Sequence, residues 1–179
     1  MFYPFKQWAE QDTEAYIIKK STTLNVGDAV QFDVTAGASY LVGAASTTSA
    51  VYGVVVGFVA SAGGSSQQNL QSTTLVTSAT NQTTEQYRAR VLPARQSRLF
   101  VADLSQTAGT TTGSGDPGFF SMASTNATLA ETSYVVQTAT ALQFFSVGSG
   151  LATSVNGPSG LYPASSTQVI GFFSNSKTV

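Results

Sequence analysis

The chain has 179 residues, of which 9% are charged and 42% hydrophobic, and its formal net charge is −1. This length is sufficient for a buried core, and the hydrophobic content excludes a highly charged disordered chain. Cysteine and histidine are both absent, which excludes disulfide bonds, Cys/His metal sites and Ser-His-Asp catalysis. A near-neutral chain has no general electrostatic attraction for nucleic acid or an anionic membrane, so we expect neither as a partner.

Residues 1–20 are predicted to form an extended N-terminal arm. The segment is dense in aromatic residues, and Pro4 favours an extended start. Because aromatic side chains dominate protein interfaces, two interpretations stand side by side: the segment folds over its own core, or it docks on a neighbouring subunit. The candidate subunit contacts in this arm are Phe2, Tyr3, Phe5 and Trp8. A basic region followed by an unbroken apolar run is missing, so we do not expect a signal peptide.

Residues 21–105 are predicted to form a first β-unit. The stretch 24–28 is typical of a turn, in which Gly27 and Asp28 supply the turn chemistry. Residues 29–34 then alternate between apolar and polar side chains, as expected for a strand with one buried face. Residues 51–59 combine β-branched and aromatic side chains with no charge. They predict a strand that is buried on both faces, with glycines where something packs close.

Four arginines lie close together near the end of the first unit. Tyr87, Ala89 and Val91 alternate with two of them, which predicts a half-buried strand that Pro93 either ends or places at the edge of a sheet. Three interpretations remain open for the arginines: a solvated strand face, ion pairs with an acidic protein neighbour, or contacts with phosphates. The arginines are Arg88, Arg90, Arg95 and Arg98. They complete the set of candidate subunit or capsid contacts.

The remainder of the chain is predicted to be a flexible Gly/Thr-rich loop at residues 106–118 and a second β-unit at residues 119–179, packed on the first. No stretch after residue 20 has the periodicity of a helix longer than about two turns. The fold class predicted is therefore all-β, with short antiparallel strands arranged in barrel-like or sandwich-like units. A membrane span is not expected, because the longest apolar window is interrupted by Ser46–Ser49.

Two pairs of segments suggest that the β-units are related by duplication. Residues 29–32 (Ala-Val-Gln-Phe) resemble residues 141–144 (Ala-Leu-Gln-Phe), and the strand at 51–59 resembles residues 168–173 at a similar offset. Repeats of this kind indicate repeated supersecondary units. The matches are short, so duplication and chance similarity both remain open.

The residues that could carry chemistry do not form a catalytic pattern. No local motif joins two carboxylates, and Asp28 and Asp116 lie in turn sequences with glycine or proline. The glycines of residues 107–118 are not followed by the Lys-Ser/Thr of a phosphate-binding loop. We therefore expect no enzymatic activity, no cofactor and no metal ion.

Two sequence motifs resemble the small β-barrel unit of tailed-bacteriophage head decoration (cement) proteins. The first is Val26-Gly27-Asp28-Ala29-Val30 and the second is residues 51–55 (Val-Tyr-Gly-Val-Val). Residues 90–94 followed by residues 99–102 also resemble a strand pair in phage virion β-domains. The resemblance covers about half of the chain, which is longer than small decoration proteins.

The resemblance implies a non-enzymatic structural protein of the virion. It implies a partner, the major capsid protein lattice, and assembly with copies of itself as a homotrimer that stiffens the shell. It also implies synthesis in the host cytoplasm and a final location on the capsid surface. An alternative function is a tail, fibre or surface-adhesin β-module that binds host glycans through exposed aromatic side chains.

Overall fold

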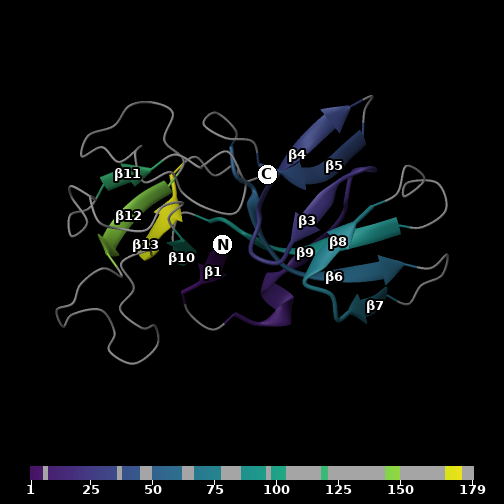
Figure 1. Ribbon diagram of the computed structural model, residues 1–179, viewed down its shortest axis with the longest axis horizontal. Coiled ribbons are helices and arrows are strands. Elements are labelled where there is room, and N and C mark those ends of the chain that lie inside the picture. Colours follow the sequence, from purple (N-terminus) through teal and green to yellow (C-terminus); the bar gives the residue numbers. More distant parts are fainter. Residues whose placement is uncertain are drawn as a thin grey trace.

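The computed structural model describes most of the first 103 residues and three short stretches after them. The described ranges are 1–5, 8–35, 38–44, 50–61, 67–77, 86–95, 98–103, 118–120, 144–149 and 168–174. They contain β-strands, which all pair antiparallel, and a single turn of 3-10 helix, η1 (Glu10–Asp12). The all-β fold class predicted from the sequence is confirmed. Figure 1 shows two sheets side by side, with the start of the chain between them.

The larger sheet has six strands in the order β2-β9-β6-β4-β5, with β7 beside β6. Its strands are β2 (Glu14–Ile17), β4 (Ala29–Thr35), β5 (Ala38–Gly43), β6 (Gly53–Ser61), β7 (Gln67–Leu70) and β9 (Gln86–Pro93). A parallel bridge joins Ile18, just after β2, to Leu41 of β5, and the Lys19 amide donates to the Leu41 carbonyl (2.9 Å). Because this bridge brings the two end strands together, the sheet curls into a barrel.

The smaller sheet has five strands in the order β1-β10-β13-β12-β11. Its strands are β1 (Phe2–Pro4), β10 (Phe100–Asp103), β11 (Gly118–Phe120), β12 (Phe144–Ser149) and β13 (Gln168–Phe173). A two-stranded ribbon, β3 (Thr23–Asn25) with β8 (Thr74–Val76), lies beside the barrel (Figure 1) and packs Leu24 and Leu75 against its core.

The central strand β6 is buried on both faces, as the sequence predicts. On one face, Val54 points toward the five-stranded sheet, and Val51, just before the strand, packs in the same core. The other face directs Val55 and Phe58 into the barrel, where Tyr52 joins them. The register of β6 against β9 shifts between Val55 and residue 57, which is the pattern of a β-bulge. The lack of charge in residues 51–59 therefore reflects two-sided burial.

The two glycines of β6 have different surroundings. A Cβ atom added to Gly53 would lie 2.5 Å from the Leu92 carbonyl oxygen and 2.5 Å from Val91 Cγ1, so β9 approaches too closely for any side chain. A Cβ atom added to Gly57, which follows the bulge, would meet nothing within 4 Å. The prediction that glycines mark close packing is confirmed at Gly53 and is wrong at Gly57.

Two hydrophobic cores share the strands of the barrel sheet. The barrel core lies inside the six-stranded sheet; its buried residues are Ile18, Leu24, Val30, Leu41, Tyr52, Val55, Phe58, Ala89 and Val91. The inter-sheet core lies between the two sheets; its buried residues are Phe2, Ala29, Ala44, Val51, Val54, Leu92, Ala94, Phe100, Ala102, Phe144 and Phe173. The inter-sheet core therefore joins the two sheets into one packed body.

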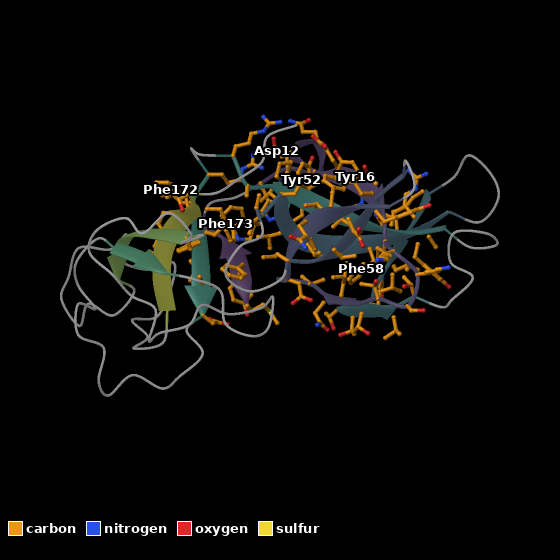
Figure 2. All side chains as sticks on the ribbon, turned by 90° about the horizontal axis from the view of Figure 1, so that it is seen from above. Asp12, Tyr16, Tyr52, Phe58, Phe172 and Phe173 are labelled. Carbon is orange, nitrogen blue, oxygen red and sulfur yellow. The ribbon has the colours of Figure 1, made fainter. Side chains whose placement is uncertain are left out.

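Phenylalanine rings from four strands of the smaller sheet meet in the inter-sheet core. The ring of Phe173 lies 5.1 Å from Phe2, 5.4 Å from Phe100 and 5.2 Å from Phe144, measured between centroids. Tilted and edge-on rings at these separations are the favourable geometry for aromatic pairs. Figure 2 shows Phe173 directed toward the barrel, and its neighbour Phe172 on the other face of β13.

Residues 26–28 of the predicted turn connect β3 to β4, whereas its first two residues, Leu24 and Asn25, belong to β3. Gly27 has φ +90°, a conformation that favours glycine, and Asp28 is buried with its carboxylate accepting from the Asn25 amide (2.8 Å). The Gly27 amide donates to the Val55 carbonyl (2.8 Å), and the Val55 amide donates to the Asp28 carbonyl (2.9 Å). The turn therefore fastens the start of β4 to β6, and the predicted role of Gly27 and Asp28 is confirmed.

Sheet membership cuts across the predicted segments of the chain. β1 from the predicted arm and β10 from the predicted first unit lie in the same sheet as β12 and β13 from the predicted second unit. Residues 106–117 of the predicted loop lie outside the described residues, and Gly118 begins β11.

The proposed internal repeat corresponds to two strand pairs with different registers. β4 pairs with β6 only at its start, with Ala29 opposite Val54 and Val30 opposite Gly53. β12 pairs with β13 along its whole length, from Phe144 opposite Phe173 to Ser149 opposite Val169. Residues 141–143 of the repeat lie outside the described residues. Duplication of the unit stays a prediction.

Candidate functional site

The four aromatic residues predicted as subunit contacts lie in different environments. Tyr3 and Trp8 are surface residues, each with 39% of its area exposed. Phe5 is half-buried and its amide donates to the Leu99 carbonyl (3.0 Å). Phe2 is only 1% exposed. Tyr3 and Trp8 are therefore the two aromatic side chains of the segment that a partner could reach directly.

The prediction for Phe2 is corrected by its burial. Its ring packs against Phe144 and Phe173 at centroid distances of 6.0 and 5.1 Å, and its amide donates to the Gly27 carbonyl (2.9 Å). Phe2 thus packs on the core of its own chain, which is the first of the two interpretations offered for the arm. The physical reason is the alternation of β1, which directs Phe2 inward and Tyr3 outward.

The strand that carries Arg88 and Arg90 has the predicted alternation. Tyr87, Ala89 and Val91 of β9 face the barrel core, so Arg88 and Arg90 lie on the outer face. Arg90 forms an ion pair with Glu10 of η1; the side chain of Arg90 is 22% exposed and that of Glu10 is 64% exposed. This acidic neighbour belongs to the same chain.

Arg95 and Arg98 lie in the connection from β9 to β10. Arg95 is exposed, and Arg98 is half-buried with its guanidinium donating to the Pro93 carbonyl at 3.5 Å. The Arg98 amide also donates to the Arg95 carbonyl (2.9 Å), which shapes the turn. Arg95 is therefore the most accessible of the four arginines.

A hydrogen-bonded group that the sequence did not indicate lies near these residues. Glu14 and Tyr16 project from the same face of β2, and Tyr52 immediately precedes β6. The Tyr52 hydroxyl donates to Glu14 Oε2 (2.6 Å), the Tyr16 hydroxyl also donates to Glu14, and the two hydroxyl oxygens are 2.8 Å apart. We call these three residues the tyrosine–glutamate cluster; Figure 2 shows its two tyrosines beside each other.

Phe32 completes the aromatic packing beneath this cluster. Its ring centroid lies 4.9 Å from that of Tyr16 and 4.6 Å from that of Tyr52, and the two tyrosine rings are 5.3 Å apart. Because the rings pack directly against one another, they bury the tyrosine bodies and leave the hydroxyls at the edge of the barrel core.

Burial and hydrogen bonding shift the pKa values of the cluster's members in opposite directions. The pKa of Glu14 is lowered, because Tyr16 and Tyr52 donate to its carboxylate and Arg95 adds a favourable charge. Burial, followed by the hydrogen bond to Glu14, raises the pKa of Tyr52 far above its ordinary value. The same two causes raise the pKa of Tyr16. Glu14 therefore stays ionised and both tyrosines stay protonated near neutral pH.

The tyrosine–glutamate cluster is suited to holding strands together. Two hydroxyl hydrogens serve three close oxygen pairs, so the charge of Glu14 is shared over the whole group. A tyrosine with a raised pKa is a weak nucleophile and a poor general base near neutral pH. The cluster instead pins β2 to the segment that enters β6.

Sequence reasoning could have found only part of this cluster. The spacing of Glu14 and Tyr16 places both on one face of a strand, which is visible in the sequence. Nothing in the sequence pairs them with Tyr52, because that contact depends on β9 lying between β2 and β6 in the sheet.

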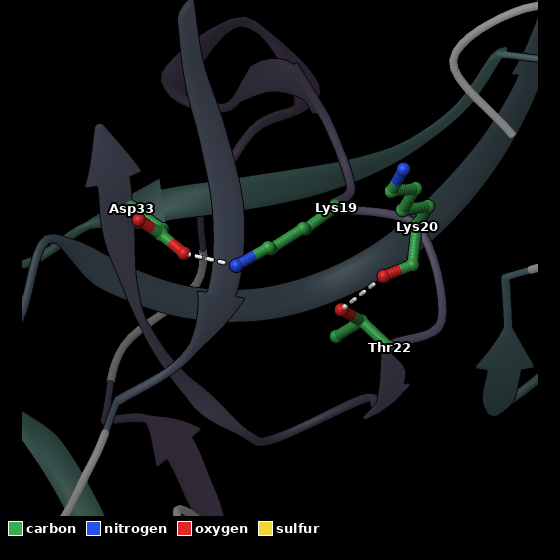
Figure 3. Close-up of polar contacts among 4 residues, drawn as sticks. All are labelled: Lys19, Lys20, Thr22 and Asp33. Atoms are coloured by element: carbon green, nitrogen blue, oxygen red, sulfur yellow. Dashed lines mark hydrogen bonds and ion pairs between the residues drawn. The ribbon is translucent and has the colours of Figure 1, made fainter. Parts of the chain in front are cut away.

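A second polar group fixes the chain where it leaves β2. Lys19 forms an ion pair with Asp33 of β4, and the Thr22 hydroxyl donates to the Lys20 carbonyl at 3.4 Å (Figure 3). Ser21, between Lys20 and Thr22, has φ 54°, an uncommon conformation for a residue with a side chain. Buried Thr77 holds this turn, since its hydroxyl contacts the Lys19 carbonyl (2.6 Å) and accepts from the Thr22 amide (2.9 Å).

The described part of the chain contains no group of three or more Asp, Glu, His or Cys residues placed to hold a metal ion. Within the same residues no helix is long and apolar enough to cross a membrane. Comparison of the chain with protein-family models, with curated proteins and with solved structures gives no match. The function is therefore argued from the residues and contacts of this chain.

Proposed function

We propose that the protein is a non-enzymatic structural subunit of a bacteriophage virion, which decorates the capsid by binding the major capsid protein lattice. In this proposal the chain assembles with copies of itself, as a homotrimer, on the outer surface of the shell. It is made in the host cytoplasm and acts by contact between subunits.

The observation that carries the proposal is the direct bonding of the two motifs that resemble decoration proteins. The Gly27-Asp28 turn and the strand that begins at Gly53 exchange backbone hydrogen bonds in both directions at Val55. Ala29 also pairs with Val54 in the sheet. Two loose motifs that lie far apart in the sequence thus form one structural unit, which supports treating them as a single feature.

Two exposed aromatic side chains supply a contact surface for this function. Trp8 and Tyr3 each expose 39% of their area, and residues 9–12 between Trp8 and β2 are exposed as well. Tryptophan, tyrosine and arginine are the residue types that contribute most to protein interfaces. Trp8 and Tyr3, with exposed Arg95, are therefore the contacts we assign to the capsid.

The test is cosedimentation of the purified protein with capsids of the phage that encodes it. We expect binding by the wild type, and a loss of about tenfold in affinity for Trp8→Ala, because a central aromatic anchor contributes on that scale. Gln11→Ala, in the exposed helix η1, is the matched control and should bind as the wild type. Absence of wild-type cosedimentation overturns the function, and unchanged binding by Trp8→Ala removes only the contact assigned to Trp8.

A second candidate function, glycan binding by a tail, fibre or adhesin module, is favoured by the same exposed rings. Sugars stack on aromatic faces, and Trp8 and Tyr3 are accessible. A glycan array probed with the folded protein separates the two functions. Binding to a defined glycan, lost in Trp8→Ala, would favour this alternative over capsid decoration.

A further inference from the structure

Strand β1 is an edge strand held to the body of the protein by contacts that belong to the five-stranded sheet and to the Gly27 turn. It pairs with β10, with Phe2 opposite Ala102 and Tyr3 opposite Val101. On its other side the Phe2 amide donates to the Gly27 carbonyl. β1 therefore fills a slot between β10 and the turn, although the next strand in the chain, β2, lies in the other sheet.

The side chain that fills this slot is deeply buried. Phe2 is 1% exposed, and its ring contacts Phe144 and Phe173 in the inter-sheet core. Removing β1 without replacing it would open a space in the core and expose an edge of the sheet. The slot therefore requires an occupant that has the shape and backbone pairing of β1.

The described part of the connection between Phe5 and β2 is held less tightly than either strand. Residues 8–12 are all exposed, and η1 within them has no buried residue. The ion pair between Glu10 and Arg90 has one largely exposed partner, since the Glu10 side chain is 64% exposed and that of Arg90 is 22% exposed, so solvent weakens its hold on the segment. At its far end the connection is fixed, because Glu14 is bonded to Tyr16 and Tyr52. The lightly held part therefore lies between two well-anchored strands.

The length of this connection is sufficient to reach another molecule. From Pro4 to Glu14 an extended chain spans about 33 Å, at ~3.3 Å per residue. That span is comparable to the diameter of a small domain, so β1 of one copy can reach the slot of an adjacent copy. In that slot an identical strand makes the same contacts, and the exchange loses no packing.

We propose that β1 exchanges between copies of this chain, so that β1 of one molecule occupies the slot beside β10 of its neighbour. The self-docked and exchanged forms share the same strand contacts, and their balance depends on the concentration of neighbouring copies. An attached strand acts at an effective concentration in the millimolar range. Isolated molecules are therefore self-docked, and crowding of copies in an assembly favours exchange. The proposal needs no capsid and is independent of the proposed function.

The test uses the absence of cysteine from the chain. One population carries Tyr3→Cys with an isotope label, and the other carries Val101→Cys without a label. Tyr3 and Val101 are opposed residues in the register of β1 and β10. Opposed Cα atoms of an antiparallel pair are about 4.5–5.5 Å apart, within the range that a disulfide spans. The two populations are mixed natively, or refolded together from denaturant, and then oxidised.

We expect a labelled–unlabelled disulfide dimer, detected by mass, whose yield rises several-fold between about 10 µM and about 1 mM total protein, because the attached strand competes at millimolar effective concentration. The double variant Tyr3→Cys/Val101→Cys, oxidised at low concentration, should close within one chain and run as a monomer. Val76→Cys, at an exposed position of the β3–β8 ribbon, replaces Val101→Cys as the control for random collision and should give only background.

Two results would overturn the proposal. The first is a yield of labelled–unlabelled dimer, in the co-refolded sample, that does not exceed the yield with Val76→Cys, while the double variant forms its intrachain disulfide. The second is failure of the double variant to close, which would remove β1 from the slot altogether. Capsid cosedimentation is measured separately, so failure of exchange and failure of the proposed function give different patterns.

Discussion

The barrel sheet takes its strands from one stretch of the chain, residues 14–93, whereas the five-stranded sheet gathers strands from residues 2–4, 100–103, 118–120, 144–149 and 168–173. Their cores differ in the same way. The barrel encloses a core of its own with tyrosine hydroxyls bonded at the rim. The five-stranded sheet packs its phenylalanines against the outside of the barrel. The barrel therefore has one core of its own and shares a second, whereas the phenylalanines of the smaller sheet are buried in the shared core.

The largest effect is expected from the ring at the centre of the inter-sheet core. Phe173→Ala removes contacts with Phe2, Phe100 and Phe144. We expect the free energy of unfolding to fall by about 3–5 kcal/mol, the usual cost of truncating a buried phenylalanine. Denaturant unfolding followed by fluorescence measures it. Phe172→Ala, at a half-buried position on the opposite face, is the matched control; an equal loss there would contradict the assignment of Phe173 to the core.

The next prediction concerns β6, the strand that serves both cores. Gly53→Ala places a Cβ atom 2.5 Å from the Leu92 carbonyl oxygen, and we expect it to destabilise the protein by about 1–3 kcal/mol through overpacking. Gly57→Ala meets open space at an ordinary φ and should change stability by less than about 1 kcal/mol. The two positions lie four residues apart on the same strand, and thermal melts of the two variants provide the comparison. Equal melting temperatures would show that close approach of β9 is unimportant.

A smaller effect is expected at the rim of the barrel. Tyr52→Phe keeps the ring packing with Phe32 and removes the hydrogen bond to Glu14. We expect a loss of about 1 kcal/mol at pH 7, the net contribution of one such bond. Denaturant unfolding at pH 7 measures the loss, and an unchanged free energy of unfolding would contradict a stabilising role of this bond.

The hydrogen bonds that Tyr16 and Tyr52 donate to Glu14 make stability depend on pH. The pKa of Glu14 is lower in the folded protein than its ordinary value of about 4.3. A carboxylate with a lowered pKa stabilises the fold above the unfolded pKa, and this contribution is lost as the pH falls through the folded pKa. The stability difference between wild type and Glu14→Gln should therefore be full at pH 7 and shrink as the pH drops below about 4. A difference that grows toward low pH would contradict the assigned hydrogen bonds.

The smallest effect is expected where the N-terminal connection crosses β9. Glu10→Gln removes the ion pair with Arg90, and the change in unfolding free energy should be about 1 kcal/mol or less, because the Glu10 side chain is 64% exposed and solvent weakens the pair. The effect should diminish further at high salt. Gln11→Glu, at the next position, adds charge without that pair and serves as the control. A loss comparable to that of Phe173→Ala would mean that the connection is tightly anchored.

The local features of the fold were predictable from the sequence, because they depend on neighbouring residues. Two-sided burial of β6 follows from its unbroken apolar composition, and the turn at Gly27 and Asp28 follows from its residue types. The alternation of β9, with Arg88 and Arg90 outward, follows from the period of a strand.

The long-range features were not predictable from one sequence. β1 pairs with β10 rather than with β2, and no local pattern specifies which strands meet. The burial of Phe2 depends on that pairing, so the sequence left open whether its ring faces the core or a partner. The contact between Glu14 and Tyr52 depends likewise on the strand order. Gly57 shows a subtler limit, since a glycine in a strand indicates equally a close approach or a bulge.

The parallel bridge between Ile18 and Leu41 has a consequence for local opening of the barrel. It joins β2 to β5 through a hydrogen bond from the Lys19 amide, so among the described residues the seam is far shorter than the ladder between β6 and β9. Regions with few backbone bonds open before the rest of a protein unfolds. The Lys19 amide should therefore exchange with deuterium sooner than the amides inside β6. Its exchange rate reports how often β2 and β5 separate.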